Sequence, residues 1–209
     1  MSPPRHLVFD FAGVLFRWRP LVLLQQVLPQ RAHDAASALR LAAAIFQGYE
    51  GDWADFDRGR VQPDALVQRI AARTGLPAAE LRRVVDAVPA ELQPQPAVVA
   101  LLARLRAAGR RLYYLSNMPE VYAQHLERTH EVVGWFDDGV ISARVGLVKP
   151  EPAIFALAAQ RFGAAPAELL FIDDIAANVR AAQAAGWQAL QFDDAAQCEA
   201  ALRARGLLG

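Results

Sequence analysis

The chain has 209 residues, of which 54% are hydrophobic, and its 22 Lys and Arg residues balance its 22 Asp and Glu residues. This apolar content can bury a sizeable core and excludes a disordered chain. The formal net charge of zero argues against nucleic acid as the main partner. A single cysteine, Cys198, excludes a disulfide framework and a cysteine-based zinc site, and we expect it in the core.

No apolar run approaches the ~20 residues that a membrane-spanning helix needs. The first residues, MSPPRHLVFDF, lack the apolar region and the small-residue cleavage site of a signal peptide. We therefore expect a soluble cytoplasmic protein with no membrane partner. Its oligomeric state is open between a monomer and a homodimer.

The first strand is predicted at residues 7–9, a short apolar run of the kind that is buried on both faces of a parallel sheet. It ends in Asp10, and Gly13 follows where the chain must turn. Ligands of open α/β sheets bind at the carboxyl ends of the strands. Asp10 is thus a candidate nucleophile or metal ligand, with a surface turn aspartate as the alternative.

An all-helical segment follows the first strand, because apolar residues recur at helical spacing with no strand-like run between them. The expected helices cover residues 20–28, 32–46, 63–74 and 77–88. Pro89, Pro94 and Pro96 mark a return linker, since closely spaced prolines interrupt a helix. Residues 17–90 are therefore predicted to form a small helical cap domain.

The rest of the chain alternates between strands and helices, as a doubly wound sheet does. Strands are expected at residues 112–115, 139–142, 169–172 and 188–192, with helices between them. The predicted fold is an α/β, doubly wound, Rossmann-like parallel sheet. The core domain then comprises residues 1–16 and 91–209, with the cap inserted between them.

Separate segments bring polar groups to the carboxyl edge of this sheet, namely Asp10, Ser116 with Asn117, Lys149, and Asp173 with Asp174. Carboxylates from different strands can hold a hard cation such as Mg²⁺. A hydroxyl group and an ammonium group are what a phosphate oxyanion needs. A carboxylate held between a metal and a cation stays ionised and can attack phosphorus.

These residues, in this order, resemble the motifs of the haloacid dehalogenase (HAD) superfamily of hydrolases. The matching stretches are VFDFAGVLF, YYLSN, GLVKPEPAIF and LLFIDDIAANVRAAQAAG, and the insert resembles the small helical cap of subfamily I. Within the superfamily the chain most resembles bacterial α-D-glucose-1-phosphate phosphatases. The N-terminal phosphatase domain of soluble epoxide hydrolases is a more distant relative.

The resemblance implies a role for each residue. Asp10 would be the nucleophile and a magnesium ligand, together with the backbone carbonyl of Ala12. Asp174 would bind the metal directly, and Asp173 would bind it through water or orient Lys149. Ser116, the backbone amide of Asn117 and Lys149 would hold the phosphoryl group of a small phosphorylated metabolite.

The chain departs from the family pattern at Ala12, where most phosphatases of the superfamily carry a second aspartate. That aspartate protonates the leaving group and then activates water, and loss of such help costs about 10²–10⁴-fold in rate. Three interpretations follow. The first is a magnesium-dependent phosphatase. A sugar phosphate is the favoured substrate, because the sugar that leaves a sugar 1-phosphate needs little protonation. The others are a catalytically impaired protein that binds a phosphorylated ligand and, less favoured, a 2-haloacid dehalogenase.

The cap should supply contacts to the leaving group. The candidates near its entrance are Phe16, Arg17, Trp18, Trp53 and Arg58. Trp18 could stack on a sugar ring, although packing in the cap core is the commoner use of such a tryptophan. Asp52, Asp55 and Asp57 form an acidic stretch around Trp53 that disfavours a bisphosphate.

Overall fold

The computed structural model describes residues 4–208 and contains a parallel five-stranded sheet with the strand order β3-β2-β1-β4-β5. The strands are β1 (His6–Phe9), β2 (Arg111–Ser116), β3 (Asp138–Ile141), β4 (Leu169–Asp173) and β5 (Gln188–Gln191). The expected strands are thus confirmed to within one residue at each end, as is the doubly wound α/β fold.

Strand β1 lies at the centre of the sheet and pairs with β2 on one side and β4 on the other. Leu7, Val8 and Phe9 have no exposed surface. Because side chains alternate along a strand, Leu7 and Phe9 enter the apolar cluster on one face and Val8 the cluster on the other. The apolar run is therefore buried on both faces, as predicted.

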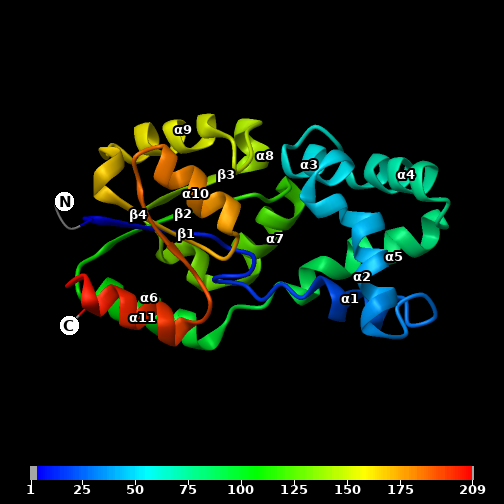
Figure 1. Ribbon diagram of the computed structural model, residues 1–209, viewed down its shortest axis with the longest axis horizontal. Coiled ribbons are helices and arrows are strands. Elements are labelled where there is room, and N and C mark those ends of the chain that lie inside the picture. Colours follow the sequence, from blue (N-terminus) through cyan, green and yellow to red (C-terminus); the bar gives the residue numbers. More distant parts are fainter. Residues whose placement is uncertain (1–3, 209) are drawn as a thin grey trace.

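Helices cover both faces of the sheet (Figure 1). Those that follow the insert are α6 (Pro96–Ala107), α7 (Glu120–Thr129), α8 (Ser142–Val145), α9 (Pro152–Phe162), α10 (Ala176–Ala184) and α11 (Ala195–Ala204). Short 3-10 turns occur at η2 (Glu131–Trp135) and η3 (Pro166–Glu168). Cys198 on α11 is fully buried, which confirms it as a core residue.

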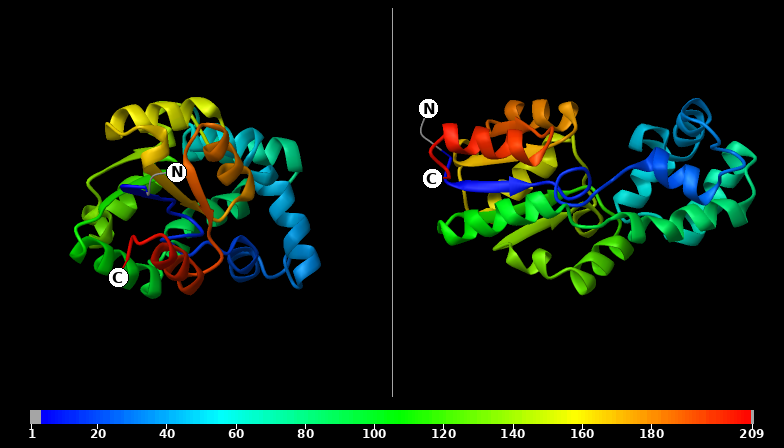
Figure 2. Two further views of the ribbon diagram at one scale, coloured as in Figure 1. Left: turned by 60° about the vertical axis from the view of Figure 1, so that its left-hand side comes forward. Right: turned by 90° about the horizontal axis from the view of Figure 1, so that it is seen from below.

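The inserted helices lie together at one end of the molecule, to the right of the sheet in Figure 1 and in the right-hand view of Figure 2. They are α1 (Pro20–Val27), α2 (Ala35–Phe46), η1 (Gln47–Tyr49), α3 (Gly51–Asp57), α4 (Pro63–Thr74) and α5 (Ala78–Glu91). Helix α3 was not predicted, because the glycines at 48, 51 and 59 suggested only a connecting segment.

The chain leaves and re-enters the sheet domain through two segments that lie side by side. The amide of Arg17 donates to the carbonyl of Gln93 at 2.9 Å, and the amide of Gln95 donates to that of Leu15 at 2.8 Å. Arg17 and Arg19 both form ion pairs with Glu91 at the end of α5. We propose this paired segment as the junction between core and cap.

Pro89 does not lie in the return linker as expected but inside α5. A proline has no N–H group, so the carbonyl of Val85, four residues earlier, lacks its helical donor. The hydroxyl group of Tyr122, on α7, donates to that carbonyl at 2.9 Å. The helix therefore continues past the proline, and its missing hydrogen bond becomes a contact between the insert and the core.

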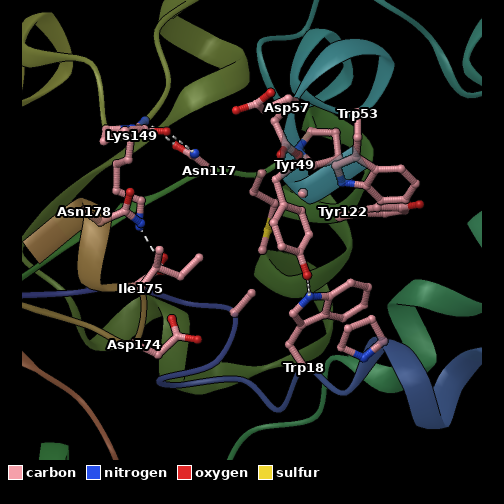
Figure 3. Close-up of a pocket in the computed structure, with 18 of the residues that line it drawn as sticks. Trp18, Tyr49, Trp53, Asp57, Asn117, Tyr122, Lys149, Asp174, Ile175 and Asn178 are labelled. Carbon is pink, nitrogen blue, oxygen red and sulfur yellow. Dashed lines mark hydrogen bonds and ion pairs between the residues drawn. The ribbon is translucent and has the colours of Figure 1, made fainter. Parts of the chain in front are cut away.

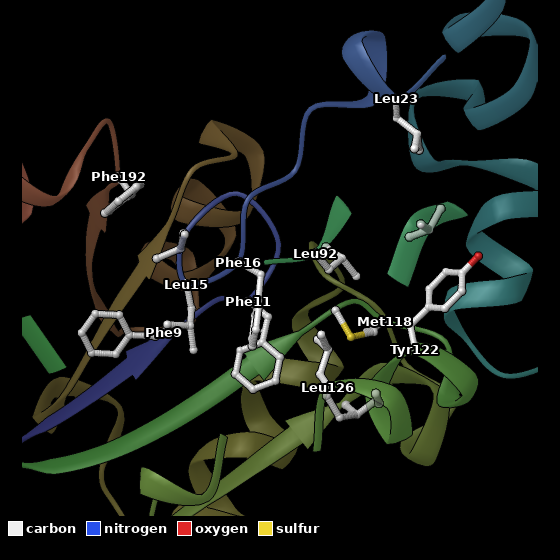
Figure 4. Close-up of a cluster of buried hydrophobic side chains, with 14 of the residues drawn as sticks. Phe9, Phe11, Leu15, Phe16, Leu23, Leu92, Met118, Tyr122, Leu126 and Phe192 are labelled. Atoms are coloured by element: carbon white, nitrogen blue, oxygen red, sulfur yellow. The ribbon is translucent and has the colours of Figure 1, made fainter. Parts of the chain in front are cut away.

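Apolar packing is continuous from the sheet into the insert (Figure 4). Phe11 contacts Phe16 edge-on, with ring centroids 5.3 Å apart, and both belong to the same buried cluster as Leu23 on α1 and Leu92. None of the described helices is long and apolar enough to cross a membrane.

Substitution Tyr122→Phe should lower the free energy of unfolding by about 1–3 kcal/mol, because it leaves the buried carbonyl of Val85 without a donor. Pro89→Ala supplies the missing N–H group. In a protein that carries Pro89→Ala, Tyr122→Phe should therefore lower the free energy of unfolding by less. Chemical denaturation of the wild type, both single variants and the double variant measures this coupling. Equal costs in the two backgrounds would contradict the proposed exchange of donors.

Candidate active site

A cavity of about 540 Å³ lies between the carboxyl edge of the sheet and the inserted helices. Asp10, Asn117, Lys149 and Asp174 border it from the sheet, and Trp18, Tyr49, Trp53 and Asp57 border it from the insert. Figure 3 shows Lys149, Asn178 and Asp174 on one side and Trp18, Tyr49, Trp53 and Tyr122 on the other. The pocket thus has one charged wall and one aromatic wall.

Lys149 lies between two carboxylates in the charged wall. Its Nζ atom is 2.9 Å from Oδ2 of Asp10 and 2.7 Å from Oδ2 of Asp173, and all three side chains are almost fully buried. Burial opposes the charge of Lys149, but Asp10 and Asp173 raise its pKa above the usual value. The ammonium group therefore stays charged beside Asp10.

Three neighbouring residues donate hydrogen bonds to the Asp173 carboxylate. In addition to Lys149, the side-chain amide of Asn178 donates to both of its oxygens at 3.1 Å, and the amide of Ile175 donates to Oδ1 at 2.8 Å. These bonds hold the carboxylate at the end of β4 and at the start of α10. Of the two roles that the resemblance implied for Asp173, the contacts favour orientation of Lys149.

Asp174 has a different environment. Its Oδ1 atom is buried and has no hydrogen-bond partner among the described residues. Asp174 also lies directly against Gly13, where an added Cβ atom would be only 2.4 Å from Oδ2 of Asp174. Gly13 has a φ of +89°, a backbone conformation that favours glycine. Burial, and then the charge of Asp173, raise the pKa of Asp174 to about 6. An unpaired buried carboxylate oxygen needs a cation or a proton.

Asp10, Asp173 and Asp174 each offer one oxygen atom, and these atoms lie within 4.8 Å of one another. Burial raises the pKa of Asp10 to about 7, although Lys149 lowers it. A divalent cation among the three carboxylates would favour their ionised forms. Oxygen donors of this kind fit Mg²⁺, so the residues present suit the metal that the sequence predicts.

Asn117 positions Lys149 through the backbone. Its side-chain amide donates to the Lys149 carbonyl at 2.9 Å, and its side-chain oxygen accepts from the Lys149 amide at 2.8 Å. Ser116 is fully buried, does not border the pocket, and its Oγ atom has no partner among the described residues. Ala12 does border the pocket.

The candidate residues at the cap entrance separate into two groups. Trp18 and Trp53 line the pocket, and the indole N–H of Trp18 donates to the hydroxyl of Tyr49 at 2.7 Å. Phe16 lies in the core and does not line the pocket, and Arg17 and Arg58 form ion pairs with Glu91 and Glu151. Core packing therefore uses Phe16, and ion pairs use Arg17 and Arg58, which leaves Trp18 and Trp53 as pocket residues.

The acidic stretch around Trp53 is also divided. Asp52 pairs with Arg73, and Asp55 pairs with Arg60 and Arg69. Only Asp57 of the three borders the pocket. The sequence did not single out Tyr49 or Tyr122 as site residues, and it considered Asp57 only as part of the acidic stretch. The approach of Tyr49 and Asp57 to Asp10 depends on how the insert docks, whereas Tyr122 reaches the pocket from α7 of the core.

The sheet order and this convergence of Asp10, Lys149 and the paired acids define a hydrolase of the HAD type. The chain belongs to the haloacid dehalogenase-like hydrolases, whose family model matches residues 4–186. The family resemblance found in the sequence is therefore confirmed. The narrower resemblance to glucose-1-phosphate phosphatases stays a prediction.

Individual relatives support this family. The chain is 29% identical over 187 residues to a sesquiterpene phosphatase of Aspergillus oryzae, across 90% of this chain and 89% of that protein. An HAD family enzyme of Bacteroides thetaiotaomicron, solved with magnesium and inorganic phosphate, superposes with a TM-score of 0.72 at 21% identity, over 91% of this chain and 94% of that one.

A dehalogenase is also among the similar structures. The L-2-haloacid dehalogenase of Xanthobacter autotrophicus, with chloropropionic acid covalently bound, superposes with a TM-score of 0.67 at 21% identity, over 99% of this chain and 85% of that one. At these identities the superpositions show a shared fold, which phosphatases and dehalogenases have in common.

Substitution Gly13→Ala should destabilise the protein more than Gly75→Ala does. Both glycines have positive φ, +89° and +72°, but an added Cβ meets Asp174 only at Gly13, and nothing lies within 4 Å at Gly75. The shared backbone cost is about 1–2 kcal/mol, and the clash should add roughly 1–3 kcal/mol. Equal losses in chemical denaturation would contradict the close approach of Gly13 to Asp174.

Proposed function

We propose that the protein is a Mg²⁺-dependent phosphatase that hydrolyses a small phosphorylated metabolite through an aspartyl-phosphate on Asp10. The observation that carries the proposal is the group formed by buried Asp10, Lys149 and Asp173 with half-buried Asp174, at the edge of a pocket large enough for a metabolite. The A. oryzae relative, a phosphatase similar along almost its whole length, supports the same class of reaction.

Each residue of the charged wall has a part in this reaction. An Asp10 oxygen attacks phosphorus, and Lys149 neutralises both Asp10 and the transferring group. Asp173 holds Lys149 in place. Asp10, Asp174 and the carbonyl of Ala12 would bind Mg²⁺ directly, with Asp173 able to bind it through water. The cation would reduce the repulsion between Asp10 and an anionic substrate. The Asn117 amide would hold the phosphoryl oxygens, whereas Ser116, to which the resemblance gave the same role, does not border the pocket.

The leaving group would occupy the aromatic side of the pocket. Trp18 could stack on a sugar ring, which supports the sugar phosphate that the sequence favours. A second candidate is the phosphate ester of an apolar alcohol, because Val88, Leu92, Met118 and Ile175 also line the pocket. The sesquiterpene phosphatase among the relatives supports this second candidate.

A substrate panel separates the two leaving groups. Glucose 1-phosphate and farnesyl phosphate carry the same phosphoryl group on a polar and an apolar alcohol. Phosphate release with Mg²⁺ should give a higher kcat/KM for the sugar ester if the sequence expectation holds. Trp18→Ala should then lower that kcat/KM by about 10-fold, through loss of roughly 1.4 kcal/mol of stacking. A preference for the farnesyl ester would establish the apolar alternative.

Asp10→Asn should abolish phosphate release, because the amide cannot replace the carboxylate as the nucleophile. Removal of divalent ions by EDTA should reversibly stop phosphate release by the wild type. Asp193→Asn is the matched control, since Asp193 also follows a strand but does not line the pocket. It should retain full activity. Phosphate release that survives both Asp10→Asn and EDTA would contradict the proposed mechanism.

The two alternatives have distinct outcomes. A catalytically impaired protein would bind phosphate or vanadate with Mg²⁺ but release no phosphate from any ester. A dehalogenase would release chloride from 2-chloropropionate without metal. The unpaired oxygen of Asp174 beside two further carboxylates disfavours metal-free chemistry, because such a cluster is electrostatically unfavourable without a cation.

A further inference from the structure

One acid in the pocket has no part in the mechanism described so far. Asp57 is the last residue of α3, is 5% exposed and borders the same cavity as Asp10 and Lys149. Figure 3 shows it at the top of the pocket, on the side of the insert and opposite Asp174. A buried carboxyl group facing a phosphate site calls for an explanation, because a charge there would repel the substrate.

The Asp57 carboxyl group is not used in packing. In the part of the chain that the structure describes, no side chain or backbone amide donates a hydrogen bond to it, and it has no ion pair. Burial raises its pKa to about 8; Lys149 lowers the value and Asp10 raises it. Tyr49 and Tyr122 also face it closely enough to be affected by its charge. The group is therefore mostly protonated at neutral pH.

The position of Asp57 is fixed by contacts with the core. The hydroxyl of Ser142 donates to the Asp57 carbonyl at 2.5 Å and accepts from the amide of Met118 at 2.8 Å. The next residue, Arg58, binds both carboxylate oxygens of Glu151 at 2.9 and 2.5 Å.

The residue after Arg58 packs against the core as well. Gly59 has a φ of +74°, and a Cβ atom there would lie 2.6 Å from the carbonyl oxygen of Ala143. Three consecutive residues of the insert thus rest on the core. Asp57 is held over the pocket even though it belongs to the insert.

We propose that Asp57 is the general acid and base of the reaction and replaces the aspartate that Ala12 lacks. The assignment rests on the proposed phosphatase function. Its basis is that the turn after Asp10 carries Ala12 in place of an acid, while an unpaired carboxyl group, with its backbone held by the core, lies across the same pocket.

The reaction has two steps. In the first, an Asp10 oxygen forms a bond to phosphorus, the bond from phosphorus to the ester oxygen breaks, and the Asp57 proton passes to that oxygen to give the alcohol. In the second, water attacks phosphorus, Asp57 takes a proton from the water, and the bond between Asp10 and phosphorus breaks. Inorganic phosphate leaves, and both carboxyl groups return to their starting states.

Two esters that differ by one methylene test the assignment. The leaving group of 4-nitrophenyl phosphate needs no proton, whereas that of 4-nitrobenzyl phosphate does. Asp57→Asn should lower kcat/KM for the benzyl ester by about 10²–10⁴-fold and that for the phenyl ester by less than about 10-fold. With the phenyl ester, the variant should also show a burst of one nitrophenolate per enzyme, because hydrolysis of the intermediate lacks its base.

The pH profile gives a second readout. For the wild type, kcat/KM for the benzyl ester should fall as pH rises through about 8, since the acid must be protonated to donate. That decline should be absent in Asp57→Asn. Asp55→Asn, on the same helix with its carboxylate in surface ion pairs, is the control and should match the wild type on both esters. Thermal unfolding checks that each variant is folded.

The outcomes separate this inference from the function on which it rests. If the wild type hydrolyses both esters and Asp10→Asn neither, but Asp57→Asn loses nothing or loses equally on both esters, the phosphatase stands and the assignment of Asp57 is wrong. If the wild type releases phosphate neither from these two esters nor from glucose 1-phosphate or farnesyl phosphate, the proposed function fails and this inference fails with it.

Discussion

The buried bridge of Lys149 between Asp10 and Asp173 is the interaction on which the rest of the site depends. An ammonium group and two carboxylates are costly to remove from water unless each is paired. Asn117 fixes the backbone of Lys149, and Asn178 and the Ile175 amide fix Asp173. Lys149 and Asp173 are therefore both held in position. Asp10 is held between this bridge and the amide of Phe11. The Asp10 carboxylate, the nucleophile of the proposed reaction, is thus oriented before any substrate arrives, as preorganised electrostatics requires.

The insert completes the site through backbone contacts as much as through side chains. The carbonyl of Val85 accepts from Tyr122 because Pro89 cannot donate to it, and the carbonyl of Asp57 accepts from Ser142. Both bonds join the insert to the core close to the pocket. They are accompanied by the ion pair of Arg58 with Glu151 and by those of Arg17 and Arg19 with Glu91. The aromatic wall is therefore held at a defined distance from the charged one, which is what a pocket with a specific leaving group needs.

The absence of an acid at position 12 shapes the chemistry of the pocket. An aspartate there would come from the same turn as Asp10. With Ala12 in its place, a proton donor for the proposed reaction would have to reach the leaving group from elsewhere, and the insert is the part of the molecule that borders the pocket opposite Asp10. An acid carried by the insert couples proton transfer to docking of the insert on the core. Catalysis and closure of the pocket would then depend on the same contacts at residues 57–59.

The sequence alone determined the sheet, the helical insert and the strand-end residues, because apolar periodicity and strand ends are local properties. Asp10, Lys149, Asp173 and Asp174 could be named as candidates because each lies in a contiguous motif. Only the tertiary structure decided that Trp18 and Trp53 line the pocket while Arg17 and Arg58 do not, that Pro89 continues a helix, and that Asp57 faces Asp10. These features depend on contacts between the insert and the core, such as Arg58 with Glu151, whose partners lie far apart along the chain. No local pattern specifies such a pairing.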